Sequence, residues 1–230
     1  MQCAEIELKF PIDDLDRLQS RLPDLGFQLN TPRTFEENTL YDTPGRTLRG
    51  SRQILRLRRY GDLWTVTHKR QAQPSAPSGT PRYKVRIETE TRVEDGPALG
   101  AIFEQLGYAP VFHYEKFRTE WSQAGSMVED PLPADPAYPG KVSPINPAGH
   151  PVPVGHLVID ETPIGNYAEL EGPTSWIDRT LARLGVDPAT CLTDSYGRLF
   201  LAWKDRTGSP VENLTFDEIS APAMLQPALR

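Results

Sequence analysis

Glutamates at a spacing of two residues occur near both ends of the sequence. Glu5 and Glu7 lie in the alternating segment 3–10, and Glu169 and Glu171 lie in the alternating segment 167–171. In a β-strand, residues at this spacing point to the same side, so each pair presents two carboxylates together. Carboxylate oxygens are the ligands that Mg²⁺ and Mn²⁺ prefer. The spacing therefore predicts a site for divalent metal.

Basic residues recur at the same spacing on other segments. Arg56 and Arg58 share one side of the segment 53–60, and Lys116 and Arg118 share one side of the segment 111–121. Lys and Arg side chains donate charge-assisted hydrogen bonds to phosphate oxygens. We therefore expect a highly anionic ligand. Further basic residues on the polar sides of other alternating segments are Lys9, Lys69, Lys84 and Arg86.

Alternation of apolar and polar residues predicts eight strands, and helical periodicity predicts amphipathic helices between and after them. An open antiparallel sheet with one charged face in water would explain any single strand. It accounts poorly for all of them, because several strands carry charges of mainly one sign. A closed barrel with helices packed outside and a polar tunnel inside accounts for them better. The expected segments are 3–10, 34–42, 53–60, 63–70, 82–92, 111–121, 156–161 and 167–171.

Like charges clustered inside such a barrel would be costly without a compensating ligand. The ligand must bind metal and carry much negative charge, and an inorganic or nucleoside triphosphate does both. The predicted fold class is therefore α+β, mainly antiparallel β, with an eight-stranded closed barrel. We expect one domain over residues 1–205, a Pro-rich insertion at about 123–155, and a poorly ordered tail over 206–230.

Bulk composition limits the other possibilities. The chain has 230 residues, 38% of them hydrophobic and 24% charged, which is enough for a buried core. A net charge of −6 is not typical of a nucleic-acid binder. The sequence has no apolar run that could span a membrane, no secretory signal and only two cysteines. We therefore expect a cytoplasmic protein with no nucleic-acid or membrane partner.

The chain resembles the CYTH superfamily, the triphosphate tunnel metalloenzymes. The resemblance begins with the family's N-terminal Glu-x-Glu-x-Lys motif, which Glu5, Glu7 and Lys9 match. Further matches follow in the family's order as far as Ser195 and Tyr196. Mammalian-type thiamine triphosphatases have Trp where this chain has Ile54, so the resemblance does not favour thiamine triphosphate. The other matching positions are Arg56, Arg58, Thr67, Lys69, Arg86, Glu88, Glu90, Lys116, Arg118, Asp160, Gly165, Tyr167, Glu169 and Glu171.

This resemblance implies an antiparallel tunnel that hydrolyses a triphosphate with Mg²⁺ or Mn²⁺, as a monomer or homodimer. A class IV type adenylate cyclase and a non-catalytic nucleotide or polyphosphate binder are the alternatives. The implied metal ligands are Glu5, Glu7, Glu90, Asp160, Glu169 and Glu171. The implied substrate-binding residues are Lys9, Arg56, Arg58, Lys69, Lys84, Arg86, Lys116 and Arg118. Of these, Lys9, Arg56, Arg58, Lys69 and Arg118 are the expected catalytic residues.

Overall fold

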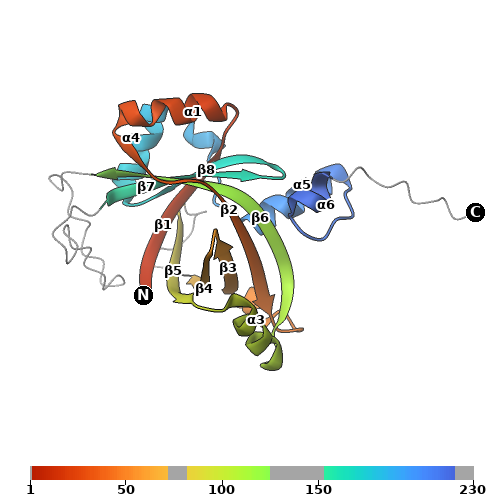
Figure 1. The fold of residues 1–230 in the computed structure, drawn as a ribbon. Helices are drawn as coiled ribbons and strands as arrows, with labels where there is room; N and C mark the ends of the chain where they lie inside the picture. The colour runs from red at the N-terminus through yellow and green to blue at the C-terminus, as the bar shows by residue number, and fades with distance from the viewer. Residues whose placement is uncertain (1, 72–81, 125–152, 221–230) are drawn as a thin grey trace, which may run out of the picture.

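The computed structural model of the protein describes residues 2–71, 82–124 and 153–220. Its strands form one closed antiparallel barrel in the order β1-β5-β4-β3-β2-β6-β7-β8 (Figure 1). The predicted fold class is confirmed. The strands are β1 (Gln2–Pro11), β2 (Phe27–Asp42), β3 (Ile54–Tyr60), β4 (Leu63–Gln71), β5 (Lys84–Val93), β6 (Ala109–Ala124), β7 (Pro153–Thr162) and β8 (Gly165–Glu171).

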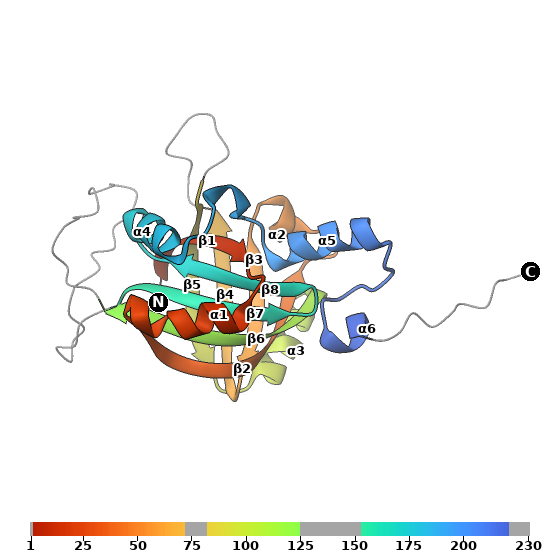
Figure 2. The same cartoon turned by 90° about the horizontal axis from the view of Figure 1, so that it is seen from above.

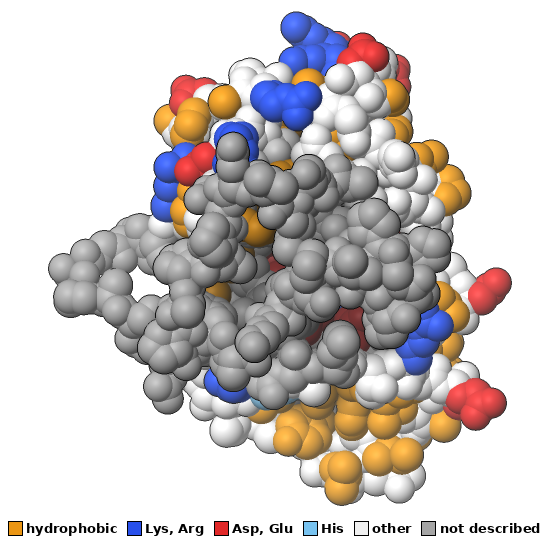
Figure 3. Space-filling model, turned by 90° about the vertical axis from the view of Figure 1, so that its left-hand side faces the viewer, with side chains coloured by type: hydrophobic (Ala, Val, Ile, Leu, Met, Phe, Trp, Pro, Cys, Tyr) orange, Lys and Arg blue, Asp and Glu red, His pale blue; other side chains and the backbone are white. Residues whose placement is uncertain are grey.

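Helices cover the outside of the barrel. Figure 2 shows α1 and α4 lying across β7 and β8, with α5 and α6 toward one end. Figure 3 shows hydrophobic side chains gathered at the level of α3, where Ile102 is 49% exposed. No helix among residues 2–71, 82–124 and 153–220 is long and apolar enough to cross a membrane. The helices are α1 (Leu15–Arg21), α2 (Thr47–Gly50), α3 (Gly96–Gln105), α4 (Thr174–Leu184), α5 (Tyr196–Thr207) and α6 (Phe216–Ser220), with short 3-10 helices at Pro23–Leu25 and Pro188–Thr190.

The strands turn their apolar side chains outward, beneath these helices. Leu8 of β1 and Leu170 of β8 are at most 2% exposed and pack in one cluster with Ile177 of α4. Gly185 ends α4 in the left-handed conformation, at φ 71°, which glycine adopts without steric cost. Because alternate residues of a strand point to opposite faces, burying the apolar side under helices directs the charged side into the barrel.

Strand β2 is longer than its sequence pattern indicates. The alternation predicts a strand from residue 34, whereas the structure has β2 from Phe27. The pairing of β2 with β6 shifts register between Leu29 and Thr31 and again between Thr31 and Thr34. Pro32 has no backbone N–H to donate, and such irregularities break the two-residue period. The two-residue alternation therefore does not predict residues 27–33 of β2.

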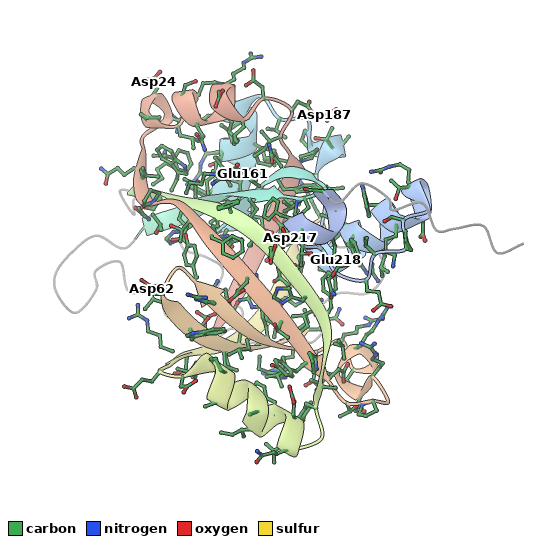
Figure 4. The ribbon with its side chains drawn as sticks, turned by 45° about the vertical axis from the view of Figure 1, so that its right-hand side comes forward. Asp24, Asp62, Glu161, Asp187, Asp217 and Glu218 are labelled. Atoms are coloured by element: carbon green, nitrogen blue, oxygen red, sulfur yellow. The ribbon has the colours of Figure 1, made fainter. Side chains whose placement is uncertain are left out.

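The segment that follows α5 packs against the barrel. The expected tail from residue 206 is wrong for residues 206–220, because Leu214 is fully buried and exchanges backbone hydrogen bonds with the β6 strand. Figure 4 shows Asp217 and Glu218 on α6, next to β6. The Glu218 carboxylate accepts hydrogen bonds from the backbone N–H of Glu212 and of Asn213 at 3.1 and 3.0 Å. Residues 125–152 of the expected insertion and residues 221–230 lie outside the described residues.

Leu214→Ala is expected to lower the free energy of unfolding by about 2–5 kcal/mol, because it removes a buried side chain and leaves a cavity. Leu201→Ala is the matched control, since Leu201 on α5 is 46% exposed, and it should change that free energy by less than about 1 kcal/mol. Denaturant titration measures both. Equal effects would show that the segment after α5 does not stabilise the barrel.

Candidate functional site

One end of the barrel interior contains a cavity of about 120 Å³. Six of its lining side chains are Lys or Arg, and four are Glu. The basic residues come from five strands, so only the closed barrel brings them together. The lining residues are Glu5, Glu7, Lys9, Leu40, Ile54, Arg56, Lys69, Lys84, Tyr114, Lys116, Arg118, Glu169, Glu171, Ser195, Tyr196 and Gly197.

The two glutamate pairs form one wall of this cavity. Strand β1 pairs with β8, which places Glu7 opposite Glu171 and Lys9 opposite Glu169. Lysines contact three of the four carboxylates. Lys9 Nζ lies 2.8 Å from Glu169 Oε1, Lys69 Nζ donates to Glu5 Oε2 at 2.7 Å, and Lys84 Nζ donates to Glu7 Oε1.

Glu171 is the fourth carboxylate, and it differs from the other three. It has no hydrogen bond or ion pair with any residue in the described part of the chain. Burial raises its pKa to about 8, and the negative charges of Glu5, Glu169 and Glu7 contribute to the same shift. A partly buried carboxylate among other carboxylates is stabilised by an added cation.

The donor chemistry of this wall fits a hard divalent cation such as Mg²⁺ or Mn²⁺, because all its donors are carboxylate oxygens. Among the described residues no three His, Cys, Asp or Glu side chains are already grouped closely enough to hold an ion. The lysines explain this spacing, since Lys69 and Lys84 hold Glu5 and Glu7. Glu171 has no such lysine partner, and rotation of the Glu5 and Glu7 side chains would bring their carboxylates closer together around an added cation.

Glu171→Gln is expected to stabilise the metal-free protein at pH 8 and to have little effect on its stability at pH 4. The folded-state pKa lies above the ordinary value of 4.5, so the folded protein keeps a proton that the unfolded chain loses. The contribution to stability therefore falls as pH rises from about 4.5 to about 8. Removing the charge should add at least about 1 kcal/mol at pH 8, or about 2–4 °C in Tm.

Thermal unfolding with a chelator at the two pH values measures this effect. Glu169→Gln is the matched variant on the same strand. Lys9 and Arg118 together hold the pKa of Glu169 well below its usual range, although burial acts to raise it. Its replacement should therefore lower Tm at pH 8. If Glu171→Gln lowered Tm at pH 8, the ionised Glu171 carboxylate would not be destabilising in the folded protein.

The opposite wall is basic, and Asp160 organises it. Asp160 of β7 is fully buried, and its oxygens accept hydrogen bonds from Lys116 Nζ at 2.9 Å and from Arg118 Nε and Nη2, both at 2.7 Å. The Tyr196 hydroxyl donates to the same carboxylate at 2.6 Å. The structure therefore places Asp160, an expected metal ligand, among cations behind the cavity and apart from the Glu5 and Glu7 wall.

Tyr196 has a position in the site that the alternation of polar and apolar residues does not predict. It is the first residue of α5, and the Ser195 side chain accepts the Arg198 backbone N–H at the start of that helix. The Lys9 ammonium group lies 3.6 Å from the centre of the Tyr196 ring, a cation–π contact. Tyr196 thereby contacts both walls. The only sequence signal for it is the Ser-Tyr match to the family.

Three other expected site residues lie away from the cavity lining. Arg86 is at the rim, where its Nη1 donates to the Arg52 carbonyl oxygen at 3.1 Å. Arg58 and Glu90 lie deeper in the barrel and contact each other, with Arg58 Nη2 3.3 Å from Glu90 Oε1. Lys9, Arg56, Lys69, Lys84, Lys116, Arg118, Glu5, Glu7, Glu169 and Glu171 are the expected residues that the cavity brings together.

Sequence reasoning missed two buried polar residues of β2. Glu36 and Asn38 are both fully buried, and Asn38 Nδ2 donates to Glu36 Oε1 at 2.9 Å. Lys116 Nζ lies 3.3 Å from Glu36 Oε1. Their signal was present, because they alternate with outward residues in the segment 34–42 at the spacing used for the other strands.

Comparison with known proteins supports a family for this barrel and its charged interior. Residues 4–171 match the model of the CYTH domain, so the chain belongs to the CYTH family. A protein of Methanocaldococcus jannaschii named as a putative adenylate cyclase is 30% identical over 114 residues, which are 50% of this chain and 61% of that relative. The matched region therefore spans less than two thirds of that relative's length.

Solved structures share the fold at low sequence identity. The PH1012 protein of Pyrococcus horikoshii superposes with a TM-score of 0.61 at 16% identity, covering 85% of this chain and 98% of its own. A putative adenylate cyclase of Vibrio parahaemolyticus gives 0.58 at 17%, covering 86% and 97%. A putative adenylyl cyclase from Hippeastrum, described as having a dominant triphosphatase activity, gives 0.52 at 15%, covering 88% and 96%.

Proposed function

We propose that the protein hydrolyses an inorganic or nucleoside triphosphate bound in the barrel cavity with Mg²⁺ or Mn²⁺. One observation carries the proposal. Six basic side chains and four glutamates line a single cavity, so the site has a net positive charge for an anion and carboxylates for its metal. The triphosphatase activity described for the Hippeastrum neighbour is consistent with this assignment.

In this proposal the basic wall holds the phosphates. Lys116 and Arg118 are fixed by Asp160, so their donors are already oriented when the ligand enters. Arg56 and Lys69 approach from the neighbouring strands β3 and β4. These cations neutralise the charge that develops on the leaving diphosphate.

The acidic wall would hold the metal through Glu5, Glu7 and Glu171, with Glu169 beside them. A bound divalent ion supplies charge neutralisation on the phosphate oxygens and lowers the pKa of a bound water. The lysines that now contact Glu5 and Glu7 are then free to donate to phosphate oxygens. Glu171 gives up its proton more readily once a cation lies beside it.

Adenylate cyclase activity is the second candidate, favoured by the name of the Methanocaldococcus jannaschii relative. In that reaction the ribose 3′-hydroxyl attacks the α-phosphorus and diphosphate leaves. The same phosphate-binding cations serve both reactions. The products, and not the phosphate site, therefore distinguish the two activities.

The test is to incubate the purified protein with inorganic triphosphate, ATP and thiamine triphosphate, each with Mg²⁺ or Mn²⁺, and to identify the products. Orthophosphate from inorganic triphosphate or ATP is the expected result. Cyclic AMP with diphosphate would replace the hydrolase by the cyclase. Tight binding of a triphosphate without turnover of any substrate would indicate a non-catalytic binder.

A further inference from the structure

The cavity occupies only part of the barrel interior. Its lining reaches Leu40 on β2, Arg56 on β3 and Lys69 on β4. The next inward-facing residues along these three strands are Asn38, Arg58 and Thr67, and none of them lines the cavity. Asn38 and Thr67 are fully buried. The protein's own side chains therefore fill the barrel beyond the cavity, and we call Glu36, Asn38, Arg58, Thr67 and Glu90 the floor.

Glu36 is the centre of the floor. It is fully buried, and its Oε2 lies 3.9 Å from both Arg58 Nη1 and Arg118 Nε, while Lys116 Nζ lies 3.3 Å from its Oε1. Burial alone would raise its pKa, but Lys116, Arg118 and Arg58 together hold the pKa of Glu36 well below its usual range. Glu36 is therefore a permanent internal anion just behind the basic wall.

Glu90 neutralises the floor's arginine from the other side. Arg58 Nη2 lies 3.3 Å from Glu90 Oε1, Arg58 Nε donates to Thr65 at 3.2 Å, and the Thr67 hydroxyl donates to Glu90 Oε2 at 2.7 Å. Arg58 is thus the one cation among the five floor residues, against two carboxylates. A phosphate that moved past Arg56 would meet the Glu36 and Glu90 carboxylates, and the floor's cation, Arg58, already pairs with both.

We propose that this floor, with Glu36 as its central residue, sets how deeply a phosphate chain enters and so determines chain-length specificity. The inference rests on the proposed function, because it concerns the same cavity. A triphosphate uses the cations that line the cavity. A fourth phosphate reaches no further cation, because Arg58 already contacts Glu36 and Glu90.

Glu36→Ala should open the floor and leave Arg58 with Glu90 as its one carboxylate partner among the floor residues. Binding of linear inorganic tri- and tetraphosphate is measured by titration calorimetry with a chelator present, so that metal-dependent turnover consumes neither ligand. In the wild type we expect the two dissociation constants to agree within about threefold, because the extra phosphate gains no contact. In Glu36→Ala, tetraphosphate should bind about tenfold more tightly relative to triphosphate, through Arg58.

Glu37→Ala is the matched control. Glu37 is the next residue of β2, points outward and pairs with Arg59 at 3.6 Å, so its replacement should leave the ratio of dissociation constants unchanged. Glu90→Ala is the second variant, since the Glu90 side chain is 33% exposed and its loss removes the closer of the two carboxylate partners of Arg58. Thermal unfolding establishes whether each variant is folded. If Glu36→Ala does not fold, the ratio of dissociation constants in Glu90→Ala tests the proposal.

If the ratio of dissociation constants stays at the wild-type value in the folded floor variants, the floor does not determine chain-length specificity. A wild-type protein that binds tetraphosphate tenfold more tightly than triphosphate would show the same. Binding of both phosphates without turnover when Mg²⁺ is added later would overturn the proposed hydrolase activity. The ratio of dissociation constants would then still test the role of the floor. A wild-type protein that binds neither phosphate with the chelator, and neither binds nor hydrolyses them when Mg²⁺ is supplied, would overturn both proposals.

Discussion

Arg56→Ala is expected to lower kcat/KM for the triphosphate substrate by about 10²–10³-fold, the usual cost of removing one preorganised donor to a developing negative charge. Arg56 lines the cavity and is held by Thr67 Oγ1, which accepts from its Nη2 at 3.2 Å. Its Nε is buried and has no hydrogen-bond partner among the described residues.

Arg59→Ala is the control on the same strand. Arg59 points outward, its side chain is 48% exposed, and it contacts Glu37 at 3.6 Å. Steady-state kinetics of the two variants, with thermal unfolding to establish the fold, make the comparison. An Arg56 variant that is as active as the Arg59 variant would show that the phosphates bind elsewhere.

Glu5→Gln is expected to lower turnover at least about 100-fold at fixed Mg²⁺ and to raise the Mg²⁺ concentration needed for half-maximal activity. The substitution keeps the shape of the side chain and removes a charged oxygen ligand, which Mg²⁺ requires. It also frees Lys69, whose Nζ lies 2.7 Å from Glu5 Oε2. A control must therefore separate loss of a metal ligand from loss of the lysine contact.

Glu88→Gln provides that separation. Glu88 of β5 also lies 2.7 Å from Lys69 Nζ, but it does not line the cavity. Its replacement should leave the Mg²⁺ dependence unchanged and reduce turnover by less than about tenfold, the effect of a partly buried ion pair. If both variants lose activity equally and neither changes the Mg²⁺ dependence, Glu5 positions Lys69 and does not bind a metal.

The barrel and its charged interior could be predicted because both depend on alternation alone. Glu5, Glu7 and Lys9 show which side of β1 is polar, and Leu8 shows that the other side is apolar. Once every strand has one charged and one apolar side, closing the sheet gives a polar interior. The resemblance to the CYTH family rested on the same inward-facing residues, and the match of residues 4–171 confirms it.

Depth along the barrel could not be predicted, because it depends on the register between strands. Arg56 and Arg58 are equivalent by alternation, yet Arg56 lines the cavity and Arg58 lies in the floor. The same limit applies to Asp160 of β7. It accepts one hydrogen bond from Lys116 and two from Arg118 on β6, and one from Tyr196 on α5. The buried Leu214 was missed because a short segment with one apolar anchor has no period to detect.

The most direct measurement is a crystal structure of the protein with Mn²⁺ and a triphosphate whose bridging oxygens are replaced by imido groups. We expect an anomalous manganese peak at Glu5, Glu7 and Glu171, and phosphates in contact with Arg56, Lys116 and Arg118. Phosphates bound outside the barrel, or a fully bound triphosphate with no manganese at these glutamates, would contradict this expectation.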